Sequence, residues 1–305
     1  MSIYINENGI IKQIKEKPFK LEKEIHELFE SNLGSIMGLE LVASEFSIQN
    51  KRIDTLAFDT QTNAFIIIEY KRDKNISVID QGFAYLALMT QNKADFIVEY
   101  NESLKKHLKR NEVDWSQSRV IFVSTGFTEN QKLASDFKDS AIELWEIKRF
   151  ENNTVSITPV KKSRSAESIK PLTRQNKELR AVQDEIKVYT EEEHIAKSTE
   201  EIKELYELVR NRILTLAYDI EVMPLKVSIA FRKDKKNLCS LKLQTENIKI
   251  WINAKWGEID DPKGVSRDVS KIGHHGCGDY EICIKDDRQL EYILSLIKEK
   301  LSDND

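Results

Sequence analysis

Three charged residues, Asp54, Glu69 and Lys71, are spaced so that they could form a metal-dependent hydrolytic site. They lie in the stretch R-I-D-T-L-A-F-D, T-Q-T-N, A-F-I-I-I-E-Y-K, in which two apolar runs flank a short polar turn. This pattern predicts a β-hairpin whose second strand is covered on both faces. Side chains two residues apart on a strand point the same way, so Glu69 and Lys71 should emerge together, with Asp54 opposite them. Burying such groups is costly unless they are paired or bind a metal, which gives a reason to expect chemistry there.

Two predicted helices flank this hairpin and carry further polar candidates. The helix over residues 21–32 has an apolar stripe beside a row of acidic residues, and spacing alone does not favour Glu24 over its neighbours. The helix over residues 78–90 carries Gln81 and Tyr85, which share one face at i and i+4. The residues alone leave two interpretations open: an ordinary surface pair with Tyr85 partly buried, or a pair turned towards the site or a nucleic acid.

The order of apolar segments predicts two domains in the 305 residues. Strands mixed with helices over residues 1–160 predict an α/β domain around one sheet, including a strand at 94–99 and a basic helix at 102–110. Residues 190–305 predict a small α+β domain with one sheet and two helices.

A basic linker is predicted between them, over residues 161–189. Its first part, residues 161–180, holds seven Lys or Arg against two Glu and has few large apolar residues. A solvated tether is the simpler interpretation. The alternative is a strap that contacts nucleic-acid phosphates through Lys161, Lys162 and Arg164.

The whole chain carries a formal net charge of −4, so any contact with a polyanion must be local. The N-terminus lacks the basic flank and long apolar run of a signal peptide, and no apolar segment approaches the length of a membrane span. The three cysteines are an odd number without C-x-x-C spacing, which is typical of a reducing compartment. We therefore expect a cytoplasmic protein without a membrane partner.

Residues from about 18 to 100 resemble the PD-(D/E)xK nuclease superfamily, and within it the NucS-like (EndoMS-like) DNA endonucleases. The matching segments are E-I-H-E-L-F-E-S-N-L, R-I-D-T-L-A-F-D, F-I-I-I-E-Y-K-R and Q-G-F-A-Y-L. The resemblance implies a restriction-endonuclease-like mixed sheet flanked by helices. Ile53 stands where the superfamily name has Pro, which removes no ligand. We expect no counterpart of the separate N-terminal domain with which those endonucleases hold DNA, so their mismatch specificity is not carried over.

The same resemblance implies a set of roles. It selects Glu24 from the acidic helix. It also implies that Gln81 and Tyr85 correspond to the residues of the family's site helix and would contact nucleic acid. It implies hydrolysis of DNA phosphodiester bonds with Mg²⁺ or Mn²⁺, in which Glu24, Asp54, Glu69 and Lys71 are catalytic. Asp54 and Glu69 would be the metal ligands.

The competing hypothesis is a module that binds nucleic acid or protein on a nuclease fold without cutting. Such proteins often lose one of the charged residues, whereas all four are present here, which favours chemistry. The segment from about residue 190 to the end resembles a bacterial domain of unknown function that often carries the label of a predicted transport protein. DNA is the expected partner, in repair or in phage defence, and the chain could act as a homodimer.

Overall fold

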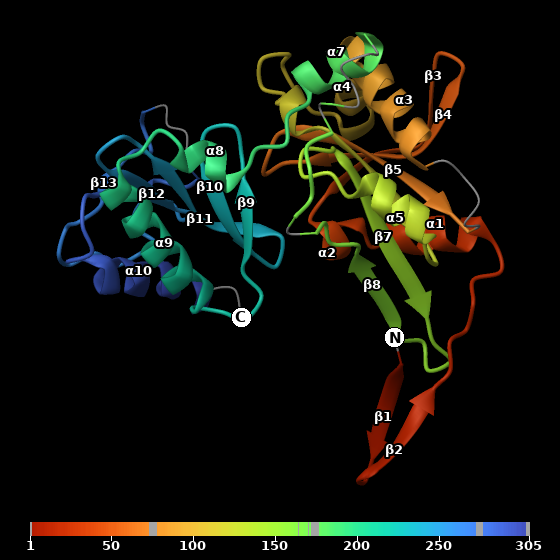
Figure 1. Ribbon diagram of the computed structural model, residues 1–305, viewed down its shortest axis with the longest axis horizontal. Helices are drawn as coiled ribbons and strands as arrows, with labels where there is room; N and C mark the ends of the chain where they lie inside the picture. Colours follow the sequence, from red (N-terminus) through yellow and green to blue (C-terminus); the bar gives the residue numbers. More distant parts are fainter. Residues whose placement is uncertain are drawn as a thin grey trace. The chain divides into compact units, whose positions relative to one another are not determined.

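The computed structural model describes residues 2–72, 78–163, 165–169, 171, 177–272 and 277–302. The chain divides into two compact units, unit 1 over Met1–Val188 and unit 2 over Tyr189–Asp305 (Figure 1). Each unit has a hydrophobic core of its own.

The elements described in unit 1 are strands β1 (Ile3–Glu7), β2 (Ile10–Ile14), β3 (Glu40–Ile48), β4 (Lys51–Asp59), β5 (Ala64–Lys71), β6 (Arg119–Ser124), β7 (Ile142–Arg149) and β8 (Val155–Pro159), and helices α1 (Glu22–Glu30), α2 (Leu33–Met37), α3 (Val78–Gln91), α4 (Lys93–Leu104), η1 (Trp115–Gln117), α5 (Glu129–Ser135) and α7 (Lys177–Glu185). Among these described elements, β3 to β8 form one six-stranded sheet in sequence order, while β1 and β2 form a separate hairpin. The pairs β3–β4, β4–β5 and β7–β8 are antiparallel, and β5–β6 and β6–β7 are parallel.

Helices cover both faces of this sheet (Figure 1). Ile25 and Phe29 of α1 pack with Ile66 and Ile68 of β5 on one face. Helices α3, α4 and α7 contribute to the core on the other face, which also holds Phe65. Strand β5 is buried from Ala64 to Tyr70, as its continuous apolar run predicts. The expected class, an α/β unit with a mixed sheet flanked by helices, is confirmed, and an α+β unit follows it.

The segment predicted as a strand at 94–99 is instead part of helix α4. Its residues Phe96, Ile97 and Tyr100 are buried, while Val98 is half exposed. That burial follows the helical period, although aromatic and β-branched residues also favour strands. The basic helix expected at 102–110 is also wrong, because α4 ends at Leu104 and the next residue adopts a left-handed backbone.

The expected linker is packed on unit 1 over its described part. Val182 of α7 and the following Ile186 are 3% and 5% exposed, within the core that α3 and α4 share. The main chain continues this contact, because the Lys187 N–H donates to the Ser116 carbonyl at 3.0 Å. Residues 182–187, at the end of the predicted linker, are therefore packed rather than solvated, and their apolar side chains are core residues.

The elements described in unit 2 are helices α8 (Glu191–Ile195), α9 (Glu200–Leu214) and α10 (Leu290–Ser302), and strands β9 (Glu221–Pro224), β10 (Ile229–Lys233), β11 (Lys236–Leu243), β12 (Ile248–Ile252), β13 (Arg267–Asp268) and β14 (Tyr280–Ile284). The sheet runs in the order β13-β14-β12-β11-β10-β9, and α9 and α10 bury their apolar stripes in its core. Nowhere in the described ranges is a helix long and apolar enough to cross a membrane.

Candidate active site

Strands β4 and β5 separate at the two predicted carboxylates. The last main-chain pair between them is Thr55 with Ile68. Beyond it, the Asp54 N–H donates to Glu69 Oε1 at 3.1 Å, and the Tyr70 N–H donates to Asp54 Oδ2 at 3.0 Å. Each carboxylate thus takes the place of a carbonyl of the ladder. We call these residues, Asp54 and Thr55 on β4 with Glu69 and Tyr70 on β5, the β4–β5 fork.

Glu69 is the most deeply buried of the charged residues at the fork, at 2% exposure. Its Oε2 accepts hydrogen bonds from Lys71 Nζ and Gln81 Nε2, both at 3.1 Å. Burial raises the pKa of Glu69, the charge of Asp54 raises it further, and Lys71 lowers it. The two carboxylates of Asp54 and Glu69 therefore share a desolvated site with the single ammonium group of Lys71. The site thus has a deficit of positive charge.

Helix α3 completes the wall around Glu69. Gln81 Nε2 also lies 3.1 Å from the hydroxyl of Tyr85, and that hydroxyl donates to the Arg52 carbonyl at 3.1 Å. Burial raises the pKa of Tyr85 far above its usual value, so the hydroxyl stays protonated and remains a donor. Gln81 Nε2 and the Tyr85 hydroxyl thus bond within the protein, to Glu69 and to the start of β4.

Glu24 does not join the fork. Its carboxylate pairs with Arg149 of β7 at 2.9 Å, and the Arg149 guanidinium lies over the Phe19 ring. Another acid of α1, Glu30, contacts the fork, because its Oε1 accepts from the Thr55 hydroxyl at 2.7 Å. Glu22 lies beyond the end of the fork, where its Oε2 accepts the N–H of Arg72 at 3.0 Å. Two residues apart on a helix are about 200° apart around its axis, so only one of Glu22 and Glu24 can lie on the side of the fork.

The burial of the helix decides which acid that is. Ile25 and Phe29 are completely buried against the sheet, and this fixes the rotation of α1. The sequence pattern therefore shows which acid of α1 faces the site only when it is known which face of the sheet α1 covers.

The basic residues predicted to contact nucleic acid differ in their surroundings. Lys162 donates to the Ser140 carbonyl at 2.5 Å, and burial lowers its pKa, so the structure does not support a phosphate contact by its ammonium group. Lys161 is exposed, and it lines a cavity of about 300 Å³ together with Lys162 and with Lys132 of α5. Arg164 lies outside the described residues.

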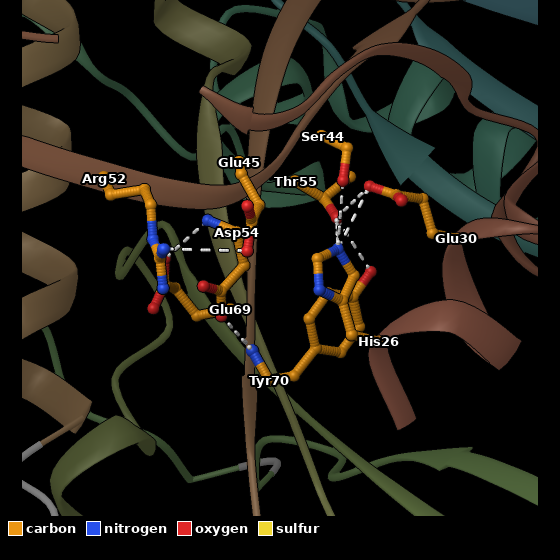
Figure 2. A network of polar contacts seen from close by, with 9 residues as sticks. All are labelled: His26, Glu30, Ser44, Glu45, Arg52, Asp54, Thr55, Glu69 and Tyr70. Carbon is orange, nitrogen blue, oxygen red and sulfur yellow. Dashed lines mark hydrogen bonds and ion pairs between the residues drawn. The ribbon is translucent and has the colours of Figure 1, made fainter. Parts of the chain in front are cut away.

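A cavity of about 490 Å³ opens beside the fork, between α1 and the ends of β3 and β4. It is lined by Glu22, Lys23, His26, Glu27, Glu30, Ser44, Glu45, Arg52, Asp54 and Tyr70. His26, Glu30, Thr55 and Tyr70 meet in one network of polar contacts, to which Ser44 adds a long contact of 3.5 Å with His26 (Figure 2). The sequence prediction missed these residues, although Thr55 and Tyr70 directly follow Asp54 and Glu69.

The donor set fits a hard divalent cation. Mg²⁺ is commonly held by one or two carboxylates, with waters and substrate phosphates completing its shell. Asp54 and Glu69 supply two such carboxylates, and the deficit of positive charge at the fork favours a cation. In the part of the chain that the structure describes, no group of three or more His, Cys, Asp or Glu residues is arranged to hold a metal. The fork would therefore need waters and phosphates as further ligands.

Comparison with known proteins relates the whole chain to one relative. An uncharacterized protein from Haemophilus influenzae is 52% identical over 303 residues, which is 99% of this chain and 100% of that protein. This chain belongs to the same family as that protein. Residues 191–300, within unit 2, also match a family described as a domain of unknown function, DUF5655.

One solved structure is similar to part of this chain. It is a crystal structure of a repair endonuclease from Pyrococcus abyssi, at 20% identity and a TM-score of 0.22. The match covers 39% of this chain and 43% of that chain. A likeness this weak does not bear on the activity of the family.

Proposed function

We propose that unit 1 is a metal-dependent nuclease that hydrolyses DNA phosphodiester bonds, with Mg²⁺ or Mn²⁺ held by Asp54 and Glu69. The observation that carries the proposal is the convergence at the fork. Glu69 lies 3.1 Å from the Asp54 amide and 3.1 Å from Lys71 Nζ, at the end of a strand that is otherwise apolar. Such an arrangement of charges is costly for stability alone, which favours a catalytic reason for it.

The residues of the fork have distinct roles in this proposal. When bound, the cation would supply positive charge that polarises a phosphate oxygen, and it would lower the pKa of a bound water. Lys71 would orient the attacking water and offset the negative charge that develops on the phosphate oxygens. The water oxygen would give up one proton to solvent as it bonds to phosphorus, the bond from phosphorus to the leaving sugar oxygen would break, and that oxygen would take up one proton from solvent, so one water is consumed. Gln81 would keep the Glu69 carboxylate turned towards the cation.

The roles of Asp54 and Lys71 can be separated by two substitutions. Asp54→Asn keeps the side-chain shape but removes an anionic ligand, so Mn²⁺ affinity and DNA cleavage should fall together. Lys71→Ala removes a repelling charge, so Mn²⁺ affinity should stay equal or rise slightly, while cleavage falls about 10²-fold or more. Lys109→Ala, at an exposed lysine of unit 1, is the matched control and should behave like the parent.

Calorimetry with Mn²⁺ and single-turnover cleavage of labelled DNA measure the two quantities. The cleavage screen should include single-stranded, flapped, mismatched and modified duplexes. If both variants cut like the parent, the assignment of the fork is wrong. If the parent binds nucleic acid or another protein but cuts none of these substrates with Mg²⁺ or Mn²⁺, a non-cleaving binding module replaces the nuclease.

A further inference from the structure

Four side chains form a continuous chain of polar contacts on the α1 face of the β4–β5 fork (Figure 2). The Tyr70 hydroxyl and Thr55 Oγ1 are 3.1 Å apart, and Thr55 Oγ1 donates to Glu30 Oε1 at 2.7 Å. His26 Nε2 lies 3.2 Å from the same oxygen of Glu30. The imidazole of His26 stacks on the Tyr70 ring, with centroids 4.6 Å apart and 20° between the planes. We call His26, Glu30, Thr55 and Tyr70 the α1 clamp.

The donors and acceptors of the α1 clamp are matched. The Tyr70 hydroxyl is in hydrogen-bond distance of Thr55 Oγ1 and can donate to it. Thr55 can then donate its own proton to Glu30, whose carboxylate accepts hydrogen bonds when it is ionised. Thr55 and Tyr70 are completely buried, so water cannot replace a contact that is lost.

The α1 clamp crosses the fork where the main-chain ladder has ended. Thr55 follows Asp54 on β4 and Tyr70 follows Glu69 on β5, and alternation along a strand places these pairs on opposite faces. On one face the carboxylates of Asp54 and Glu69 tie the strands through backbone N–H groups. On the other face the contact between Thr55 and Tyr70 ties them. Without that second tie, β4 could swing away from β5.

We propose that the α1 clamp positions the Asp54 and Glu69 carboxylates for a divalent cation. This inference rests on the proposed function, since it needs a cation at the fork. Two carboxylates that share one small cation depend on their separation, and groups that orient metal ligands commonly change metal affinity or activity about 10- to 100-fold when altered. Helix α1 would then act on the site by holding the fork, through His26 and Glu30.

The test uses the full chain and three substitutions of buried threonines. Thr55→Val keeps the shape but removes the hydroxyl, so Mn²⁺ affinity measured by calorimetry should weaken about 10- to 100-fold. Thr55→Ser restores the hydroxyl, so affinity should return to within about threefold of the parent. Thr62→Val is the matched control, because Thr62 is buried in the β4–β5 turn and its hydroxyl has no partner within the described ranges. It should leave Mn²⁺ affinity unchanged.

A second measurement needs no metal. Amide exchange at Tyr70, followed by NMR in metal-free protein, reports the hydrogen bond from the Tyr70 N–H to Asp54. Exchange there should be about tenfold faster in Thr55→Val and unchanged in Thr62→Val. Should Thr55→Val fail to fold, Tyr70→Phe removes the other end of the same contact and keeps the ring against His26, with the same expected effects.

The outcomes separate this inference from the proposed function. Unchanged Tyr70 exchange and unchanged Mn²⁺ affinity in a folded Thr55→Val variant would overturn the positioning role. So would an equal loss of affinity in Thr62→Val, because the effect would then follow general destabilisation. If the parent protein binds no Mn²⁺ but Tyr70 exchange is faster in Thr55→Val, the contact between the strands is supported and the metal-dependent nuclease is overturned.

Discussion

Gly82, which directly follows Gln81 on α3, allows that helix to lie close to the sheet. A Cβ atom at Gly82 would lie 2.6 Å from Ile142 Cδ1, 2.9 Å from Ile142 Cγ1 and 3.3 Å from Phe122 Cε2. Both neighbours are completely buried, on β7 and β6, so neither can move aside freely. Replacing Gly82 by Ala should therefore push α3 away from the sheet and stretch the contact between Gln81 and Glu69.

The magnitude follows from two opposing effects. Ala is favoured over Gly inside a helix by about 0.5–1 kcal/mol, whereas overpacking a core typically costs about 1–3 kcal/mol. Gly82→Ala should thus lower the free energy of unfolding by about 1–2 kcal/mol, measured by urea denaturation of metal-free protein. Gly34 of α2 is the matched control, because its Cβ would meet no atom closer than 3.9 Å. Gly34→Ala should be neutral or stabilising.

A relief variant tests the cause. Ile142→Val removes the Cδ1 atom that lies nearest, and by itself should cost about 0.5–1.5 kcal/mol. The double variant Gly82→Ala with Ile142→Val should be more stable than the sum of the single effects predicts, by at least about 0.5 kcal/mol. A Gly82→Ala protein as stable as the parent, or strictly additive effects in the double variant, would refute the packing argument.

Three further predictions concern the acids Glu22 and Glu24, the segment before residue 189 and the thiols. Glu24→Gln should lower the free energy of unfolding by less than about 1 kcal/mol, because its ion pair is partly exposed, and should leave DNA cleavage unchanged. Glu22→Gln should slow single-turnover cleavage about tenfold. Equal effects of the two variants on cleavage would contradict the rotation of α1. A fragment of residues 1–188 should unfold cooperatively in urea. A fragment of residues 1–160 should be several kcal/mol less stable, because each large apolar side chain lost from the core costs about 1.5–3 kcal/mol. Equal stability of the two fragments would show that residues 161–188 are a solvated tether. Cys283 is exposed and should react rapidly with a thiol reagent at pH 8. Cys239 is buried and Cys277 is partly exposed, and burial raises the pKa of both thiols, so Cys277 should react slowly and Cys239 only in urea. Rapid labelling of all three thiols in native protein would contradict this expectation.

The hairpin and its charged residues could be predicted from local pattern. A continuous apolar run that ends in Glu69-x-Lys71 determines a buried strand with two charges on one side, since strand alternation depends only on sequence spacing. The T-Q-T-N turn determines the partner strand, and with it the place of Asp54 opposite Glu69. The helix with Gln81 and Tyr85 could be predicted for the same reason, because its apolar face follows the helical period.

Other parts depended on which surface each element meets. Residues 94–99 have strand-forming side chains, yet they form a helix because Phe96, Ile97 and Tyr100 can then all reach the core at once. The segment before residue 189 looks polar on average, and only the packing of α7 against α3 makes its few apolar residues core residues. These are tertiary effects, which no local propensity contains.

By itself, the sequence determined that Asp54, Glu69 and Lys71 lie together at the end of a buried strand, because their spacing along two paired strands leaves one arrangement. Only the tertiary structure decided what surrounds them. The rotation of α1 turned Glu24 towards Arg149 and brought Glu22, His26 and Glu30 to the cavity. A row of acids on one helix is equally polar in every rotation. The choice among them is made by the buried Ile25 and Phe29, whose apolar contacts with the sheet outweigh any preference of an exposed carboxylate.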